Sequence, residues 1–199
     1  PYAQALAPYQ TDSMDPDSKV ILLNANESAE ELDYEIDLKR LNRYPEPQPK
    51  ALRKAYSDYC GAPENQIVIT RGGDEAIDLL IRTYCVAGQD AILVNTPTFS
   101  MYKIYAQCSG VATIEVPLCA DMQPNLDVIQ EAIETQHVKL IYLCTPNNPT
   151  GTLTTKENIK RVLDMARGKA LVIVDEAYVE FKKRYTAGLK LTKHPFKKS

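Results

Sequence analysis

Short apolar runs alternate with amphipathic helical patterns along most of the chain. Five runs are rich in β-branched residues and bounded by turn residues, which is typical of strands: 66–70, 91–95, 111–116, 139–144 and 170–175. Between them, apolar positions recur at helical spacing, as at Ile77, Leu80 and Ile81. Strands that alternate with helices and are apolar nearly throughout predict an α/β fold. We expect a mainly parallel sheet with helices on both faces, a three-layer α/β/α arrangement.

The first 45 residues have a different character. They contain one apolar run, VILLNANES, then an acidic stretch that leads to RYPEPQPK with its alternating prolines. We expect an extended N-terminal arm over residues 1–45 and a first helix near Lys50. The large domain should occupy residues 46–181, and residues 182–199 should form a basic linker or tail.

Composition and charge narrow the class of protein. Hydrophobic residues make up 44% of the 199 residues and charged residues 25%, which is typical of a globular chain. No stretch approaches the roughly 20 apolar residues of a membrane span, and the first residues lack signal-peptide features, so we expect a cytoplasmic protein. Residues 182–199 hold seven of the 23 basic residues and no acid, which leaves a net charge of −10 on the rest. An acidic body argues against a nucleic-acid partner.

The five cysteines stand singly, without any C-x-x-C pair. Only His137 and His194 could join them in a metal site, so neither a zinc cluster nor a disulfide framework is predicted. We expect buried free thiols and no bound metal.

Two glycines separate the run 66–70 from the helix that follows, which we expect to begin near Asp74. The first N–H groups of a helix have no partner within it, so those of Gly73, Asp74 and Glu75 predict a site for an anion such as phosphate. The stretch lacks the third glycine of a dinucleotide fingerprint and the G-K-[ST] of a P-loop. An ordinary turn with an aspartate cap is the alternative.

A carboxylate ends the last apolar run, at Asp175, and Tyr178 follows one helical turn later. A carboxylate that emerges from five apolar residues is costly to leave unpaired, and the nearby sequence offers no obvious cation. The protonated ring nitrogen of a bound cofactor would supply that charge. A helix-capping aspartate is the alternative.

Two further segments follow strand ends. Phe99 and Tyr102 come after the second run, where a ring could stack on a flat ligand or belong to the core. In TPNNPTG, after the fourth run, prolines restrict the backbone around Asn147 and Asn148, and Gly151 ends the turn. Because the carboxyl ends of parallel strands meet at one edge, these groups together predict a pocket for a flat, phosphorylated, nitrogenous cofactor.

The motifs RGGDE, PTF..Y, TPNNPTG and VDEAY, in this order, resemble the class II pyridoxal-phosphate aminotransferases of fold type I. Within that family the histidinol-phosphate aminotransferases are the most similar, since LAPYQ, LLNANES and RYPEPQP also match. The resemblance runs from about residue 6 to at least residue 181. It implies pyridoxal 5′-phosphate as cofactor, a small-molecule substrate and a homodimer, with no nucleic-acid or membrane partner.

The resemblance also implies roles for residues around the cofactor ring. Asp175 would pair with the protonated pyridine nitrogen, which keeps the ring an electron sink. Asn148 and Tyr178 would form hydrogen bonds with the phenolate oxygen. Phe99 would stack on the ring, at a position where the family often has tyrosine.

Other roles implied by the resemblance concern the phosphate and the substrate. Three backbone N–H groups would hold the phosphate, those of Gly73, Asp74 and Glu75. Tyr44 would reach the phosphate of the neighbouring subunit, and Tyr9 and Asn26 would lie on the substrate side.

The chain departs from the family at its end, because Ser199 lies 21 residues past Tyr178, before any segment like that of the Schiff-base lysine. None of Lys190, Lys193, Lys197 and Lys198 is expected to take that role. We therefore expect a truncation that lacks the C-terminal small domain and is inactive by itself. Two later strands are expected to lie between the runs 66–70 and 139–144, so the sheet should be open there, with strand edges prone to aggregation.

The function implied by the resemblance is transamination in histidine biosynthesis. L-Histidinol phosphate and 2-oxoglutarate would be interconverted with imidazole-acetol phosphate and L-glutamate. Two alternatives stay open: a related pyridoxal-phosphate-dependent decarboxylase of an amino-acid phosphate, and a non-catalytic fragment that keeps only the phosphate site.

Overall fold

The computed structural model describes residues 25–27, 33, 39 and 41–182, which form two compact units that meet in the sequence at Ile69 and Thr70. The first unit contains helix α1 (Lys50–Cys60), which begins where the sequence predicted, and the short 3-10 helix η2 (Glu64–Gln66). The side chain of Gln48 fastens the end of this unit. Its Nε2 donates to the carbonyl of Ile69 over 3.0 Å, and its Oε1 accepts from the Ile69 N–H over 2.7 Å.

The strand predicted at residues 66–70 does not form, so this prediction was wrong. Gln66 ends η2, and residues 67–70 belong to no strand. The N–H and C=O groups of Ile69 bond to the side chain of Gln48 instead of a neighbouring strand, and Val68 is 71% exposed. A β-branched segment becomes a strand only when a partner edge satisfies its backbone, and none of the described strands pairs with this one.

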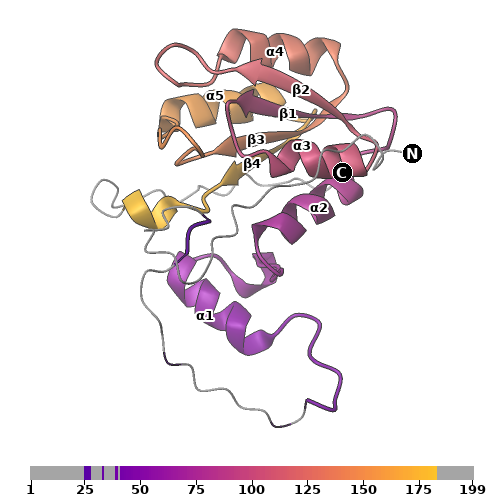
Figure 1. Cartoon of the computed structure of the whole chain (residues 1–199), viewed down its shortest axis with the longest axis vertical. Helices are drawn as coiled ribbons and strands as arrows, with labels where there is room; N and C mark the ends of the chain where they lie inside the picture. Colours follow the sequence, from indigo (N-terminus) through magenta and orange to yellow (C-terminus); the bar gives the residue numbers. More distant parts are fainter. Residues whose placement is uncertain (1–24, 28–32, 34–38, 40, 183–199) are drawn as a thin grey trace, which may run out of the picture. The chain divides into compact units, whose positions relative to one another are not determined.

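The second unit contains a four-stranded parallel sheet in the order β2-β1-β3-β4 (Figure 1). The strands are β1 (Ala91–Thr96), β2 (Ala112–Pro117), β3 (Val138–Cys144) and β4 (Leu171–Asp175). Each lies within one residue of a predicted run. The α/β class and the mainly parallel sheet predicted from the sequence are therefore confirmed.

Helices cover both faces of this sheet, as predicted. They are α2 (Gly73–Tyr84) and α3 (Met101–Cys108) on one face, and α4 (Leu126–Thr135) and α5 (Lys156–Ala166) on the other. Successive strand side chains point to opposite faces, which gives two cores. Those toward α4 and α5 include Leu93, Ile141 and Leu143; those toward α2 and α3 include Ile92, Val94, Leu140 and Tyr142. A short 3-10 helix, η3 (Val179–Lys182), follows β4.

The sheet is not open beside residues 139–144, contrary to the expectation from the sequence. β3 pairs with β1 on one side and with β4 on the other, where Leu140 is opposite Leu171 and Cys144 is opposite Asp175. The reason is that helix α5 returns the chain so that β4 lies parallel to β3, the usual outcome of a β-α-β connection. β4 is an edge strand of the described sheet, and its residues are all only partly buried.

The cysteines are only partly as expected. All five are free, but only Cys144 is buried, while Cys60 and Cys108 are exposed. The two exposed thiols occupy the last positions of α1 and α3, where a helix faces solvent. Cys85 is partly buried, and this burial raises the pKa of its thiol to about 11.

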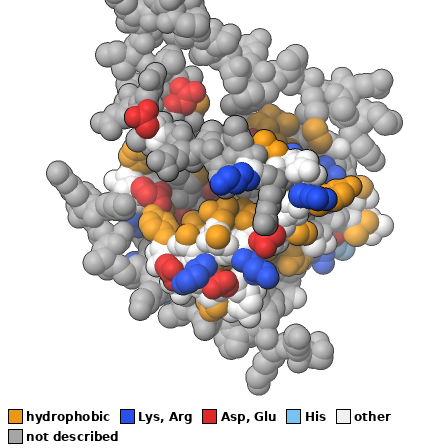
Figure 2. Space-filling view, turned by 90° about the horizontal axis from the view of Figure 1, so that it is seen from below, with side chains coloured by type: hydrophobic (Ala, Val, Ile, Leu, Met, Phe, Trp, Pro, Cys, Tyr) orange, Lys and Arg blue, Asp and Glu red, His pale blue; other side chains and the backbone are white. Residues whose placement is uncertain are grey.

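Charged side chains of both signs lie among hydrophobic ones on the face that Figure 2 presents. Several charged side chains of the described residues form ion pairs one turn apart on helices, such as Lys54 with Asp58 and Arg82 with Asp78. The described part of this face therefore has no extended area of a single sign. Within the described ranges, every helix is too short or too polar to cross a membrane.

Candidate functional site

The predicted site residues of the second unit gather at the carboxyl edge of the parallel sheet. Loops that follow β1, β3 and β4 carry Phe99, Asn148 and Tyr178, and Asp175 is the last residue of β4. Helix α2 has 12 residues and leads through residues 85–90 into the start of β1. Since it packs along the sheet, its first turn lies toward the same carboxyl edge (Figure 1). This edge is where parallel α/β sheets bind ligands.

Asp175 is a partly buried carboxylate held by two neutral donors. Its Oδ2 accepts from the hydroxyl of Tyr102 over 2.5 Å, and its Oδ1 accepts from the backbone N–H of Ala177 over 3.0 Å. No Lys or Arg among the described residues forms an ion pair with it. The carboxylate thus has a fixed orientation but no cationic partner within the described part of the chain, which suits a bound cation.

Three aromatic rings cluster on the α2 and α3 face, and the hydroxyl of one of them, Tyr102, contacts that carboxylate. Tyr102 is fully buried and stacks on Tyr142, with ring centroids 4.5 Å apart and planes at 22°. Phe99 meets Tyr102 edge-on, with centroids 5.6 Å apart and planes at 86°. Of the two rings that the sequence left open, Tyr102 belongs to the core, whereas Phe99 is only partly buried and keeps surface for a ligand.

Asn147 ties two loops together. Its Nδ2 donates to the carbonyl of Pro97 and to the hydroxyl of Thr150, both over 2.9 Å. Its Oδ1 accepts from the hydroxyl of Thr98 over 2.8 Å. Every polar atom of this amide is therefore used to join the loop after β1 to the loop after β3, a role that the sequence alone did not reveal.

Replacing Asn147 by alanine should lower the free energy of unfolding by about 2 kcal/mol, because three hydrogen bonds, two of them partly buried, are lost at once. Urea denaturation followed by circular dichroism measures this loss. Asn158→Ala is the matched control, since that side chain makes one bond, to Gln123, and should cost less than about 1 kcal/mol. Equal losses in the two variants would show that Asn147 does not join the loops.

Asn148 has a different environment from its neighbour. Its Nδ2 donates to the hydroxyl oxygen of Tyr178 over 3.1 Å, so the structure brings together two residues that the sequence assigned to one ligand oxygen. The Tyr178 hydroxyl hydrogen stays available for another acceptor. Gly151 ends the turn with φ +69°, a left-handed conformation that glycine adopts without strain, as the sequence predicted.

The first turn of α2 begins at Gly73, preceded by Gly72 with φ +89° and without any side-chain cap. The aspartate cap considered from the sequence is therefore wrong. Glu75 turns its carboxylate back to the loop, where it accepts from the Arg71 backbone N–H over 2.5 Å and pairs with the Arg71 guanidinium over 3.0 Å. These contacts, the backbone hydrogen bond foremost, lower the pKa of Glu75. With this charge matched by Arg71, the first turn keeps its free N–H groups and positive dipole end for an anion.

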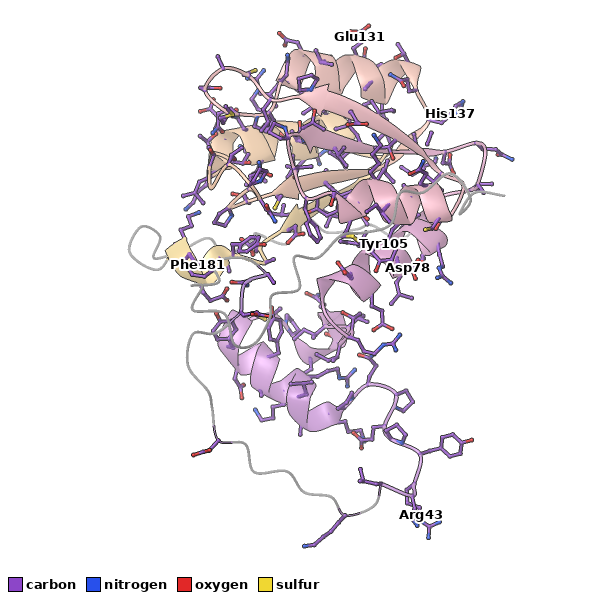
Figure 3. The ribbon with its side chains drawn as sticks, viewed as in Figure 1. Arg43, Asp78, Tyr105, Glu131, His137 and Phe181 are labelled. Carbon is purple, nitrogen blue, oxygen red and sulfur yellow. The ribbon has the colours of Figure 1, made fainter. Side chains whose placement is uncertain are left out.

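Helices α2 and α3 lie side by side on this face of the sheet. Figure 3 shows Tyr105 of α3 next to Asp78 of α2. Burial, and then the charges of Asp74 and Asp78, raise the pKa of Tyr105. The Asp74 side chain thus lies near enough to α3 to act on Tyr105, one turn before Asp78.

The other predicted positions lie in the first unit or outside the described residues. Tyr44 and Asn26 are exposed residues of the first unit, and Tyr9 lies outside the described residues. The lysines at 190, 193, 197 and 198 also lie outside them. Among described residues, no group of three His, Cys, Asp or Glu side chains could hold a metal ion.

The chain is similar in sequence to known proteins of one family. The family model for aminotransferase class I and II matches residues 9–188. Histidinol-phosphate aminotransferase 1 of Haemophilus influenzae (strain 86-028NP) is 45% identical over 178 residues, which cover 89% of this chain and 50% of the relative. The chain spans about half the length of the curated relatives it matches.

Solved structures show the same fold. The histidinol-phosphate aminotransferase from Clostridium acetobutylicum is 30% identical with a TM-score of 0.59, over 66% of this chain and 38% of that one. The enzyme of that name from Sinorhizobium meliloti, solved in complex with pyridoxal-5′-phosphate, gives a TM-score of 0.63 over 69% of this chain and 37% of that one. At 22% identity, the latter likeness concerns the fold alone.

Proposed function

Because this chain belongs to the class I and II aminotransferase family, we propose that it forms the cofactor-binding part of a pyridoxal-phosphate-dependent transaminase. The observation that carries the proposal is the set of groups at one sheet edge. Four groups there are what a flat, phosphorylated pyridine requires: a carboxylate with no cationic partner among the described residues, a partly buried ring, an amide paired with a phenol, and a helix N-terminus without a side-chain cap.

The described residues fit such a cofactor group by group. Asp175 would accept from the protonated ring nitrogen, because its charge has no cation among the described side chains. Asn148 and Tyr178 would donate to the phenolate oxygen, and Phe99 would cover one ring face. The phosphate would bind the first N–H groups of α2, those of Gly73, Asp74 and Glu75.

When bound, the cofactor supplies an electron sink for the electrons left when the Cα–H bond of an amino substrate breaks. The residues of the chain would orient the cofactor and stabilise the charges on its ring. Asp175 would keep the ring nitrogen protonated, and the amide of Asn148 would stabilise negative charge on the phenolate oxygen. Asn147 keeps the loop that carries Asn148 fixed to the loop that carries Phe99.

We further propose L-histidinol phosphate and 2-oxoglutarate as substrates, with imidazole-acetol phosphate and L-glutamate as products. Relatives named histidinol-phosphate aminotransferase at 43–45% identity over 89–96% of this chain support this choice. A homodimer in the cytoplasm, with Tyr44 of one subunit at the phosphate of its neighbour, is part of the same proposal. The full exposure of Tyr44 in the first unit is compatible with an intersubunit role.

Isothermal titration calorimetry with pyridoxamine 5′-phosphate tests the proposal. This ligand has the same ring and phosphate but no aldehyde, so its binding does not depend on a lysine. The 199-residue chain should bind it, and pyridoxamine without the phosphate should bind at least about 30-fold more weakly, because the contacts with the α2 N–H groups are lost. No heat of binding at about 1 mM ligand, or equal affinity for the two amines, would contradict it.

A further inference from the structure

Tyr102 makes a contact that packing alone does not require. It is fully buried on α3, and its hydroxyl donates to Oδ2 of Asp175 over 2.5 Å, between positions 73 residues apart in the sequence. Burial, and then the negative charge of Asp175, raise the pKa of Tyr102 far above its ordinary value. The phenol therefore stays a neutral donor at any physiological pH, and its hydrogen is directed to the carboxylate.

The neighbouring tyrosine shows that a hydroxyl buried in this cluster does not always have a hydrogen-bond partner among the described residues. Tyr142 stacks on Tyr102 with centroids 4.5 Å apart, and its hydroxyl is buried without a hydrogen-bond partner among the described residues. Of the two stacked tyrosines, therefore, only Tyr102 donates to Asp175, and its hydroxyl also lies against the thiol of Cys144. This difference provides a matched comparison for experiment.

The carboxylate of Asp175 is held from two elements at once. Oδ1 accepts from Ala177 in its own loop, and Oδ2 accepts from Tyr102 on α3. A carboxylate has about four acceptor positions, so both oxygens can still accept from a further donor. A carboxylate already fixed in orientation loses less conformational entropy when it binds a ligand, and its charge is presented in one direction.

We propose that Tyr102 is a positioning residue of the cofactor site, which holds the Asp175 carboxylate in the orientation that accepts from the ring N–H of a pyridoxal-type cofactor. This inference rests on the proposed function. It predicts that the Tyr102 hydroxyl acts only through the ring nitrogen of the ligand. The phosphate and the phenolate oxygen have other partners and should not sense its loss.

The test compares two variants and two ligands by calorimetry. Tyr102→Phe keeps the stacked ring and removes the hydroxyl, and it should weaken binding of pyridoxamine 5′-phosphate about tenfold, the usual scale for a hydrogen bond to a charged group. Tyr142→Phe should leave the affinity within about twofold, because that hydroxyl has no partner among the described residues. For the 1-deaza analogue, with C–H in place of the ring nitrogen, Tyr102→Phe and the wild-type chain should bind equally.

The ratio of the two affinities is the decisive quantity, since partial unfolding of a variant lowers both equally. A Tyr102→Phe chain with the wild-type ratio would overturn the inference, whether the two affinities are unchanged or fall together. If Asp175→Asn weakens the binding of pyridoxamine 5′-phosphate but Tyr102→Phe does not, this inference fails and the proposed function stands. If the wild-type chain does not bind that ligand, the proposed function fails with it.

Discussion

Replacing Asp175 by asparagine is expected to weaken the binding of pyridoxamine 5′-phosphate by about 100-fold, the largest effect of any single substitution at the site. The variant has nearly the same shape and still accepts from one donor, but it has no charge to pair with the protonated ring nitrogen. Removing one partner of a hydrogen-bonded charge pair at a binding site costs about 2–5 kcal/mol, and the lower part of this range corresponds to about 100-fold in affinity. Calorimetric titration of the wild-type and Asp175→Asn chains under the same conditions measures this loss of affinity.

Asp164→Asn is the matched control for this substitution. That carboxylate lies on the surface of α5 and pairs with Arg167 over 2.8 Å, with half of its side chain exposed. Exposed pairs contribute less than about 1 kcal/mol to stability, and this one is not part of the site, so the affinity should stay at the wild-type value. Equal affinities of wild type and Asp175→Asn would remove the reason for assigning a pyridine to this site.

Ile141→Ala should give the largest loss of stability, about 3–4 kcal/mol in the free energy of unfolding. Ile141 is fully buried in the central part of the sheet, opposite Leu93 on β1 and Val172 on β4. Truncation loses the transfer free energy of three carbon atoms and leaves a cavity that both neighbouring strands hold open. The urea midpoint should fall while the slope of the transition stays constant.

Val128→Ala on α4 serves as the control for the cavity. Its side chain is 39% exposed, so truncation creates no cavity, and alanine favours a helix more than valine does. The free energy of unfolding should change by less than about 0.5 kcal/mol. A comparable loss in both variants would mean that the two cores do not pack as described.

The strands that form were accessible from sequence because their signal is local. β1 and β3 are nearly continuous apolar runs, and continuity indicates burial on both faces whatever the order of strands. The three-layer arrangement follows from the alternation of strands and helices. These parts of the fold were predicted to within one residue.

Residues 66–70 show the limit of this reasoning. QIVIT has the same local pattern as the other runs, but a strand also needs a partner edge, which local pattern does not encode. The side chain of Gln48, 21 positions away, forms the hydrogen bonds with the Ile69 backbone that a neighbouring strand would otherwise form. The neighbour of β3 was missed for the same reason, because pairing order depends on how α5 returns the chain.

The sequence indicated the residue types of the candidate site but not the contacts between them. The sequence pattern singled out Asp175 after an apolar run and the pair Asn147 and Asn148 between prolines. The choice of Asn148 for the cofactor came from the family resemblance. The bond from Tyr102 to Asp175 spans 73 positions, and the bond from Asn147 to Pro97 spans 50. The only prior signal for the first was that a buried tyrosine hydroxyl usually finds a partner.

Nitrogen-15 NMR of ring-labelled pyridoxamine 5′-phosphate tests most directly whether Asp175 binds a protonated pyridine. A carboxylate close to the ring favours its charged form, so the bound nitrogen should stay protonated to a higher pH than in the free ligand. In the Asp175→Asn chain this increase should disappear. A bound nitrogen that titrates as in the free ligand, or equally in both chains, would contradict the assignment of this site to a pyridoxal-type cofactor.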